Sequence, residues 1–357
     1  MSSALTDPDS APPSSGASGY CLRFQGRDTV VPLEPGRTLL DACLSGRVPL
    51  AYNCRSGECG ECAVRMVQGQ VHEMPGADPA IFTQAMRDAG QVLTCMTFPR
   101  SDIVLDVPQG MAQQPQIHDF DAVVQRVTWF GDRTVQVTVR RPEAVQFVGG
   151  QYFEWHVPGV DRPRLYSAAN APDGPTIEFL VRIHPGGGVS DKLRRGEIDA
   201  GDVLPLRGPF GSYAFEAAAP GSAVFVAGGT GLAPVRAIVL DALAQRAGDR
   251  RITVFFGARD QAELAAAREL EQAVQRHRNL SYVPVLSHEP ADSSWSGLRG
   301  LVTDVLERSL GDQFGAQAYL CGPAPMVEAA LPLLQACGLD RSDIHCDKFV
   351  PAVANPS

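Results

Sequence analysis

The sequence predicts a multidomain protein of α+β and α/β type: a mixed α+β segment, then an antiparallel β-barrel, then a domain with a doubly wound parallel sheet. The first observation is length, because 357 residues favour two or three domains over a single core. Polar or small aperiodic stretches also interrupt the chain at residues 109–117 and 217–221, and the strand pattern changes at both. We therefore expect a first domain over residues 20–108, a linker over 109–117, a barrel over 118–216 and a last domain over 217–357.

The first domain is predicted to hold one short helix among short strands. Thr38 is a suitable N-cap, Leu39, Leu40 and Cys43 share one apolar face, and Gly46 can end the helix. Runs that alternate or are rich in β-branched residues flank it, at residues 20–24, 29–33, 63–67 and 103–107.

The middle segment is strand-rich, which favours a small antiparallel barrel. Its predicted strands lie at residues 122–127, 134–139, 151–157 and 177–183, with a helix near 190–195. In the last segment, apolar strands alternate with helical stretches, as in a doubly wound parallel sheet. Those strands are expected at residues 223–227, 252–256, 282–286 and 318–320.

Composition argues against two kinds of partner. The formal net charge is −9, opposite in sign to proteins held by phosphate contacts, so we expect no nucleic acid. No apolar run reaches the roughly 18–20 residues of a membrane-spanning helix, so we expect no membrane. Residues 1–19 carry no Lys or Arg and no apolar stretch; we expect a disordered tail rather than a signal peptide, and hence a cytoplasmic, reducing compartment.

Four of the nine cysteines form the pattern C-x4-C-x2-C followed by a distant fourth. These predicted metal ligands are Cys54, Cys59, Cys62 and Cys95. The spacing is the plant-type [2Fe–2S] pattern, and Gly57 and Gly60 supply the backbone freedom that a loop around a cluster requires. The alternative is a structural zinc site, but zinc sites favour two separated ligand pairs, whereas three cysteines here share a nine-residue span.

Two motifs in the barrel segment suggest a dinucleotide site. Arg164 and Tyr166 of the RLYS run point to the same side of a strand, so a guanidinium could bind pyrophosphate beside a ring that stacks on a flavin. Ser167 offers a hydroxyl for flavin N5. Gly186, Gly187 and Ser190 lead into a helix whose N-terminus favours phosphate. Each motif alone is also compatible with an ordinary strand or turn.

The last segment contains a second glycine-rich turn, in the run VFVAGGTGLAPV. Gly229 and Gly231 allow a close approach to pyrophosphate, and Pro234 suits a first helical turn. The last predicted strand ends in LCGPAPM, which puts Cys321 at the sheet edge where such domains bind ligands. The alternatives are a strand–helix connection without a ligand and a buried structural cysteine.

In this order, the cysteine spacing, RxYS with GGxxS, and GGTGxAP with CGPxxM resemble the ferredoxin–NAD(P)+ reductase superfamily. They resemble in particular its iron–sulfur flavoprotein branch, whose members include reductase components of bacterial multicomponent mono- and dioxygenases. The resemblance covers residues 20–349. It implies a β-grasp ferredoxin domain, a six-stranded flavin barrel and an αβ nicotinamide domain.

The resemblance also implies site residues. Those for FAD are Arg164, Tyr166, Ser167, Gly186, Gly187 and Ser190. Those for NAD(P) are Gly229, Thr230, Gly231, Pro234, Gly257, Arg259, Cys321 and Gly322. Ser167, Cys321 and Phe349 are expected nearest the reacting atoms, with Phe349 as the family's C-terminal aromatic that covers the flavin. Here eight residues, 350–357, follow Phe349, whereas in plant ferredoxin reductases the aromatic residue ends the chain.

The resemblance implies an NADH-dependent oxidoreductase that passes electrons from NADH through FAD to a [2Fe–2S] cluster. The final acceptor would be the terminal oxygenase of a ring-hydroxylating or demethylating system, of Rieske, di-iron or P450 type. A hydride carries two electrons and the cluster accepts one at a time, so the flavin stands between them. We expect the free reductase to be monomeric.

Some alternatives stay open at this point. A reductase serving a deoxysugar-synthesis dehydratase or a P450 has the same three domains, whereas a simple electron carrier would need only the ferredoxin domain. Arg259 could meet the 2′-phosphate of NADPH, but the neighbouring Asp260 would repel it, which favours NADH. The sequence decides neither FMN against FAD nor the substrate of the oxygenase.

Overall fold

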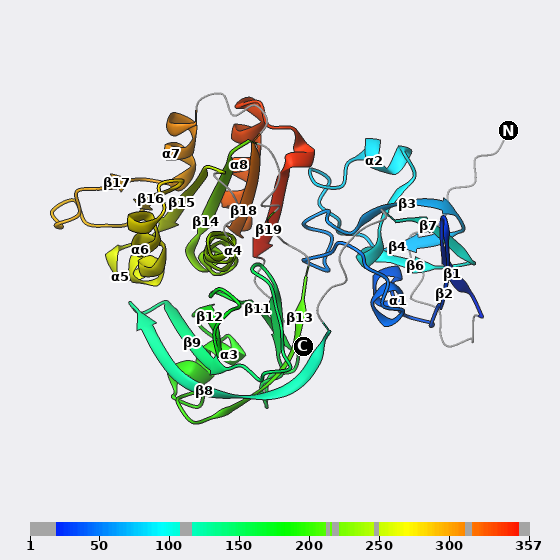
Figure 1. Ribbon diagram of the computed structural model, residues 1–357, viewed down its shortest axis with the longest axis horizontal. Helices are drawn as coiled ribbons and strands as arrows, with labels where there is room; N and C mark the ends of the chain where they lie inside the picture. Colours follow the sequence, from blue (N-terminus) through cyan, green and yellow to red (C-terminus); the bar gives the residue numbers. More distant parts are fainter. Residues whose placement is uncertain are drawn as a thin grey trace. The chain divides into compact units, whose positions relative to one another are not determined.

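The structure is a computed structural model. It describes residues 19–107, 116–211, 215, 221–245, 250–310 and 316–349. The chain divides into two compact units, residues 1–113 and residues 114–357 (Figure 1). Residues 1–18 of the expected tail and 109–115 of the expected linker lie outside the described residues.

The first unit is built on a five-stranded mixed sheet of order β2-β1-β7-β3-β5. β1 and β7 run parallel, and the other neighbouring strands run antiparallel. This arrangement is the expected β-grasp fold. Its elements are β1 (Cys21–Phe24), β2 (Arg27–Pro32), α1 (Leu39–Ser45), β3 (Ala63–Gln68), β4 (Val71–Glu73), α2 (Gln84–Asp88), β5 (Gln91–Leu93), η1 (Thr94–Met96), β6 (Thr97–Pro99) and β7 (Ile103–Asp106).

Helix α1 begins and ends where the sequence predicts. Thr38 is its N-cap: its hydroxyl accepts the Asp41 amide at 3.1 Å, and the Asp41 carboxylate accepts the Thr38 amide at 3.2 Å. This capping box satisfies two amides that the helix itself leaves unpaired. Gly46 is the C-cap. Asp41 also accepts a 2.9 Å bond from Arg55, so the start of the helix holds the loop that carries the first three cysteines.

The barrel occupies the first part of the second unit. Its six antiparallel strands have the order β11-β10-β13-β8-β9-β12, and a bridge between Ala168 and Phe179 joins the two ends of this order. Its core is made of valines and aromatic rings, among them Val137, Trp155 and Phe179. The elements are β8 (His118–Phe130), β9 (Thr134–Arg140), β10 (Tyr152–Trp155), β11 (Arg164–Ser167), β12 (Thr176–Arg182), α3 (Gly188–Arg194) and β13 (Val203–Phe210).

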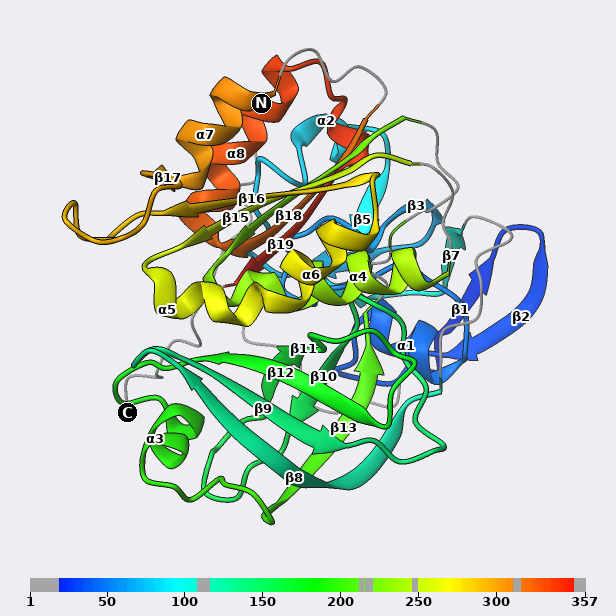
Figure 2. The same ribbon diagram turned by 60° about the vertical axis from the view of Figure 1, so that its left-hand side comes forward.

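The last part of the chain forms a six-stranded parallel sheet of order β17-β16-β15-β14-β18-β19. Figure 2 shows α7 and α8 on one face and α4, α5 and α6 on the other, which confirms the doubly wound prediction. The elements are β14 (Ala223–Gly228), η2 (Gly229–Gly231), α4 (Leu232–Ala244), β15 (Ile252–Ala258), α5 (Gln261–Leu264), η3 (Ala265–Ala267), α6 (Arg268–Arg276), β16 (Leu280–Leu286), β17 (Leu298–Arg299), α7 (Val302–Ser309), β18 (Gln317–Pro323), α8 (Ala324–Ala336), η4 (Arg341–Asp343) and β19 (Ile344–Phe349).

One expectation about this sheet is wrong. The strand that leads into the LCGPAPM run, β18, is not the last strand, because β19 follows α8 and pairs with β18. Asp347 and Lys348 give β19 a polar sequence although both are buried. Because of these polar residues, β19 lacks the apolar alternation from which a strand is predicted.

Helix α4 packs directly on the barrel at Gly149. A Cβ atom at Gly149 would lie 2.8 Å from the Ile238 Cα and 2.9 Å from the Ala237 carbonyl oxygen. The Gly149 amide also donates to Asp241 Oδ2 at 3.1 Å. Only a residue without a side chain therefore permits this approach between backbones.

We predict that Gly149→Ala destabilises the protein by about 1–3 kcal/mol, because the clashing atoms belong to helix backbone and cannot move aside. Thermal melting measures the effect. Gly174→Ala is the matched control, since its Cβ would meet nothing within 4 Å. Equal melting temperatures for the two variants would contradict the close packing of α4 on the barrel.

Candidate functional site

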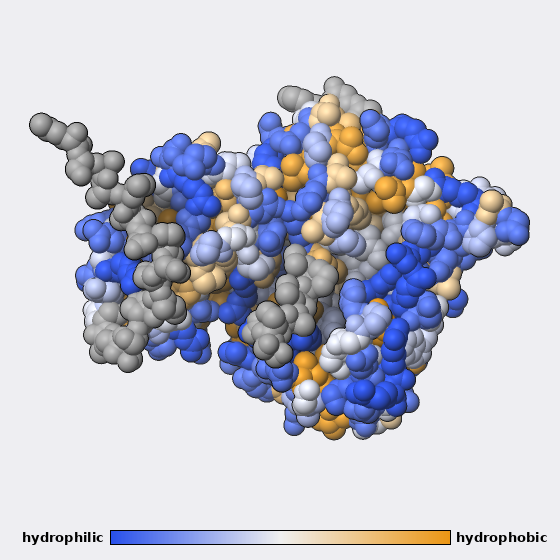
Figure 3. All heavy atoms as spheres, turned by 180° about the vertical axis from the view of Figure 1, so that it is seen from behind, coloured by the Kyte–Doolittle hydropathy of each residue, from blue (hydrophilic) through white to orange (hydrophobic). Residues whose placement is uncertain are grey.

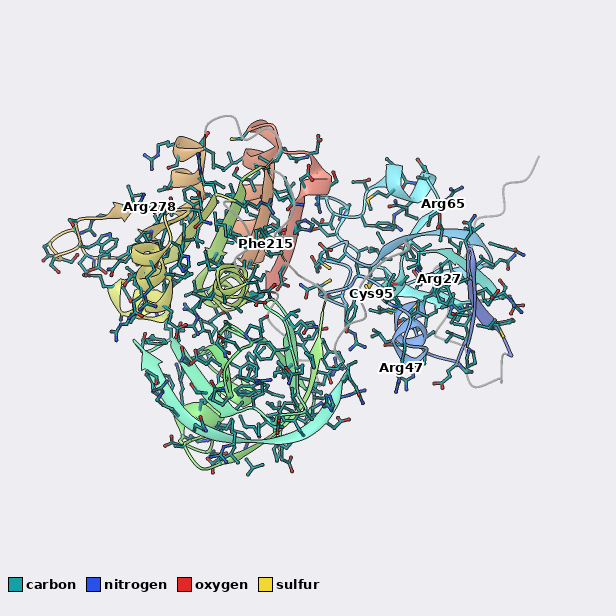
Figure 4. All side chains as sticks on the ribbon, viewed as in Figure 1. Arg27, Arg47, Arg65, Cys95, Phe215 and Arg278 are labelled. Carbon is teal, nitrogen blue, oxygen red and sulfur yellow. The ribbon has the colours of Figure 1, made fainter. Side chains whose placement is uncertain are left out.

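The predicted metal ligands all lie outside the main strands of the first unit. Cys54, Cys59 and Cys62 occupy the loop between α1 and β3, and Cys95 lies in the 3-10 turn η1 after β5. Figure 4 labels Cys95 among the irregular segments of this unit. The backbone brings the loop and the turn together, because the Thr94 amide donates to the Cys62 carbonyl at 3.2 Å.

The four sulfur atoms form two hydrogen-bonded pairs. Cys62 Sγ and Cys95 Sγ are 3.2 Å apart, and Cys54 is hydrogen-bonded to Cys59. The bond from Cys59 lowers the pKa of Cys54 to about 5, and the bond from Cys95 lowers the pKa of Cys62. One sulfur of each pair therefore favours the thiolate, which is the form that binds metal.

This pairing suits an iron–sulfur cluster better than zinc. A [2Fe–2S] cluster takes two thiolates on each of its irons, whereas a structural zinc ion takes four ligands about one centre. The donor set therefore fits the predicted cluster.

The loop backbone turns sharply around the first cysteine. Arg55, Gly57 and Gly60 have φ values of 56°, 81° and 80°, and the amides of Ser56 and Glu58 point at Cys54 Sγ at 3.4 and 3.3 Å. Left-handed backbone favours glycine, and amides aimed at sulfur stabilise thiolate. Arg55 is the exception among the three, and its ion pair with Asp41 holds it in place.

Strand β11 carries the first predicted flavin motif. It pairs antiparallel with β10, and this register puts Tyr166 opposite Phe153 and Arg164 opposite Trp155. Arg164 and Tyr166 thus share a face, as predicted, while Leu165 on the other face is 50% exposed. The Tyr166 ring lies 4.6 Å from the Trp155 ring between centroids.

The two polar side chains of β11 differ in their surroundings. Burial raises the pKa of Tyr166, so its phenol stays protonated at neutral pH. Arg164 donates to the Arg162 carbonyl at 2.9 Å, which leaves other guanidinium donors without a partner among the described residues. A protonated phenol and a half-buried guanidinium with free donors can both bind a flavin dinucleotide.

The second flavin motif follows β12. Gly186 has φ 74° with open space around it, and Gly187 is the N-cap of α3. Since β11 and β12 end the strand order and meet through the Ala168–Phe179 bridge, barrel closure brings the two motifs to one seam. Ser190 is 5% exposed, and its hydroxyl accepts the His184 amide at 3.1 Å. That hydroxyl already has a structural partner.

The two nicotinamide motifs lie against each other at the carboxyl ends of β14 and β18. A Cβ atom on Gly231 would lie 2.1 Å from the Cys321 carbonyl oxygen, and one on Gly322 would lie 2.9 Å from the Gly228 carbonyl oxygen. Gly229, in contrast, has φ 53° and nothing within 4 Å of its Cβ position. The turn is therefore packed on one side and open on the other.

The remaining predicted residues of this domain differ in exposure. Pro234 is buried in the first turn of α4, Thr230 is half-buried, and the Cys321 side chain is fully buried. Phe349 is the half-buried last residue of β19, opposite Pro323 of β18. It therefore lies at the same sheet edge as the glycine-rich turn, where open α/β sheets bind their ligands.

The acidic side chains that follow β15 are hydrogen-bonded to neighbouring backbone amides. Gly257 lies near the end of β15, where its Cβ would meet Val302 at 3.0 Å. The Arg259 amide donates to Glu263 Oε2 at 3.1 Å, and the Asp260 carboxylate caps α5 by accepting the Glu263 amide at 3.1 Å. Both carboxylates thus bind backbone amides, and Glu263 also pairs with Arg182 at 2.6 Å.

One buried charged cluster was not predicted from the sequence. Arg236 in α4 is 2% exposed and binds Glu178 and Gln136 of the barrel. The available signal was a single arginine within the apolar run LAPVRAIVL, since a charge in such a helix has to find a buried partner.

Three family models match the chain in the order of these sites. The 2Fe-2S iron-sulfur cluster binding domain matches residues 22–100, the oxidoreductase FAD-binding domain residues 131–215, and the oxidoreductase NAD-binding domain residues 225–331. The reductase component of phenol 2-monooxygenase from Pseudomonas sp. (strain CF600) is 33% identical over 339 residues, 93% of this chain and 95% of that protein. The chain belongs to the iron–sulfur flavoprotein reductases.

Other members of the family are similar over nearly the whole chain. The reductase subunit of an aromatic O-demethylase from Amycolatopsis sp. is 33% identical over 328 residues, 90% of this chain and 96% of that protein. The crystal structure of an Amycolatopsis cytochrome P450 reductase has a TM-score of 0.76 at 31% identity, covering 93% of this chain and 99% of that one. The similarity thus includes both units.

The reductase is an NADH-dependent oxidoreductase with FAD and a [2Fe–2S] cluster as cofactors. When bound, the flavin exchanges electron pairs with the nicotinamide and single electrons with the cluster.

Among the described residues, no helix is long and apolar enough to cross a membrane. The face shown in Figure 3 mixes hydrophilic and hydrophobic side chains.

We predict that Cys59→Ser abolishes electron delivery to one-electron protein acceptors, because the Cys54–Cys59 pair loses one of its two sulfur ligands. Flavin content and NADH-driven reduction of ferricyanide, which can take electrons from flavin, should persist. Cys337→Ser, at the half-buried end of α8, is the control and should keep both activities. Equal loss of both activities in Cys59→Ser would contradict the order NADH, FAD, cluster.

Arg164→Ala is predicted to lose flavin during purification, since charge-assisted hydrogen bonds to pyrophosphate are worth roughly 1.5–3 kcal/mol each. The visible spectrum of the cluster should persist, because the cysteines belong to the other unit. Arg162→Ala is the matched control: this arginine is exposed and two residues earlier in the chain. Full flavin content in Arg164→Ala would show that another residue holds the pyrophosphate.

Proposed function

We propose that this reductase supplies electrons from NADH to the terminal component of an oxygenase that hydroxylates or demethylates aromatic compounds. The supporting observation is a match along nearly the whole chain, 93% and 90%, to reductase components named for phenol 2-monooxygenase and an aromatic O-demethylase. All three domains are present, as an NADH-to-cluster route requires. The cytoplasm is the proposed compartment, since reduced cysteines are needed to bind the cluster.

Within this proposal, the four cysteines hold the cluster in two pairs, Cys54 with Cys59 and Cys62 with Cys95. In the barrel, Arg164 binds pyrophosphate, Tyr166 stacks on the flavin and Ser167 lies near flavin N5. The turn at Gly229–Gly231 receives the nicotinamide dinucleotide, because it is open on one side and ends at a helix N-terminus. The proposed domain boundaries are residues 20–108, 118–216 and 217–357.

A P450 is the second candidate acceptor. The observation in its favour is the similarity to the Amycolatopsis cytochrome P450 reductase, at 31% identity over 93% of this chain. Rieske and di-iron oxygenases are the other proposed partner types. We also propose that the reductase is monomeric when free.

Reconstitution tests the proposed function. Purified reductase and NADH are combined with candidate Rieske, di-iron and P450 oxygenases and an aromatic substrate, and product formation is measured against NADH consumption. Coupled product formation with one of these types supports the proposal and selects the partner. Cluster reduction by NADH without product formation in any combination would contradict an oxygenase as the acceptor.

Phe349→Ala is predicted to tighten NAD+ binding, strengthen the flavin–nicotinamide charge-transfer band and slow turnover through late product release. The reason is competition: an aromatic ring at this sheet edge can cover the flavin face that the nicotinamide must occupy. Apolar burial of about 25 cal/mol per Å² opposes its displacement. NAD+ titration followed by absorbance measures both effects.

The alternative for Phe349 is a packing role at the end of β19. In that case Phe349→Ala lowers the melting temperature by several degrees while NAD+ affinity stays unchanged. Thermal melting of the same sample therefore separates the two roles, and the second pattern would rule out the covering role.

A further inference from the structure

Arg236 lies at the boundary between the barrel and the parallel-sheet domain. It belongs to the first turns of α4, two residues after Pro234, and is 2% exposed. Its Nε donates to the Ala169 carbonyl at 2.5 Å, Nη1 to the Ala266 carbonyl at 2.8 Å and Nη2 to Glu178 Oε2 at 2.8 Å. The planar guanidinium thus binds three elements in three directions.

The contacts of Arg236 compensate for the burial of its charge. Glu178 is itself buried, and although burial raises the pKa of its carboxyl, the cation at Arg236 opposes that rise. Gln136 Oε1 lies 3.4 Å from both Nη atoms, and Glu269 Oε2 lies 3.9 Å from Nε. The ammonium group of a lysine at this position would present fewer directed donors and could not make the same set of hydrogen bonds.

Two of these contacts lead to the proposed cofactor sites. Ala169 is two residues after Ser167, so its carbonyl continues the backbone of the flavin strand β11. The Ala169 amide donates to the Glu178 carbonyl at 2.7 Å, so both backbone groups of Ala169 are hydrogen-bonded. On the other domain, Arg236 belongs to the helix that starts at the glycine-rich turn.

Two other polar contacts cross this boundary away from β11. Asp241 accepts the Gly149 amide further along α4, and Arg182 pairs with Glu263 of α5 at 2.6 Å. Neither contact touches the backbone that follows β11. Ala169 also packs in one apolar cluster with Leu232 and Val235 of α4. Arg236 adds directed hydrogen bonds to this contact between the flavin strand and the helix of the nicotinamide turn.

We propose that Arg236 is a positioning residue for hydride transfer, which sets the separation between the flavin strand and the glycine-rich turn without touching either cofactor. The inference rests on the proposed assignment of β11 to flavin and of that turn to nicotinamide. Hydride transfer requires the reacting atoms to lie at about 3–3.5 Å, and small displacements cost large factors in rate. Arg236 acts through Ala169 on one side and through α4 on the other.

The test is anaerobic stopped-flow reduction of the bound flavin by NADH and by NADH deuterated at both C4 positions. We expect Arg236→Gln to lower the limiting rate of flavin reduction tenfold or more, with a larger deuterium isotope effect. Flavin content and the Kd for NADH should stay within twofold of wild type. The limiting rate of Arg236→Lys should lie between those of wild type and Arg236→Gln. Lysine keeps the positive charge but lacks the planar set of donors.

Asp241→Ala is the matched control, since it removes a boundary contact of the same helix far from the turn, and its limiting rate should stay within twofold of wild type. If Arg236→Gln fails to fold because Glu178 is left unpaired, Arg236→Lys and the double variant Arg236→Gln with Glu178→Gln decide the matter. Limiting rates within twofold of wild type in these variants, or a loss confined to NADH affinity, overturn the proposal. Reduction of the wild-type flavin by NADH checks the proposed function separately, so the two failures have different signatures.

Discussion

The guanidinium of Arg236 is buried between two domains, so its hydrogen-bond acceptors have to come from both of them. The packing of the barrel against the parallel-sheet domain in the second unit depends on this requirement. The acceptors of Arg236 come from β9, β12, the backbone beyond β11 and the turn η3. Removing one partner of such a buried ion pair leaves the other uncompensated, typically at about 3–5 kcal/mol. The barrel and the parallel sheet are therefore joined by a contact that tolerates only a narrow range of relative positions.

Two further contacts also hold the barrel against the parallel-sheet domain. At Gly149 the two backbones approach so closely that no side chain fits between them. Arg182 and Glu263 form a partly buried ion pair across the same boundary. Motifs that lie far apart in the sequence, RLYS and GGTGLAP, thus belong to one packed unit.

Much of the fold and of the candidate site could be predicted from the sequence, because the decisive signals are local. Thr38 and Gly46 predict the limits of α1, and the cysteine spacing predicts a cluster. The division of the four cysteines into two pairs could not be predicted, since it depends on a contact between a loop and the distant turn η1. Strand β13 escaped detection because Pro205, Gly208 and Pro209 interrupt its apolar pattern.

The distance along the chain between Cys62 and Cys95, 33 residues, has a consequence for assembly. The first three cysteines lie within nine residues of one another, whereas the fourth is held beside them by the pairing of β3 with β5, which sets Ala63 opposite Leu93. A chain in which these strands are unpaired holds at most three of the four ligands together. Binding of the complete cluster is therefore coupled to the folding of this sheet.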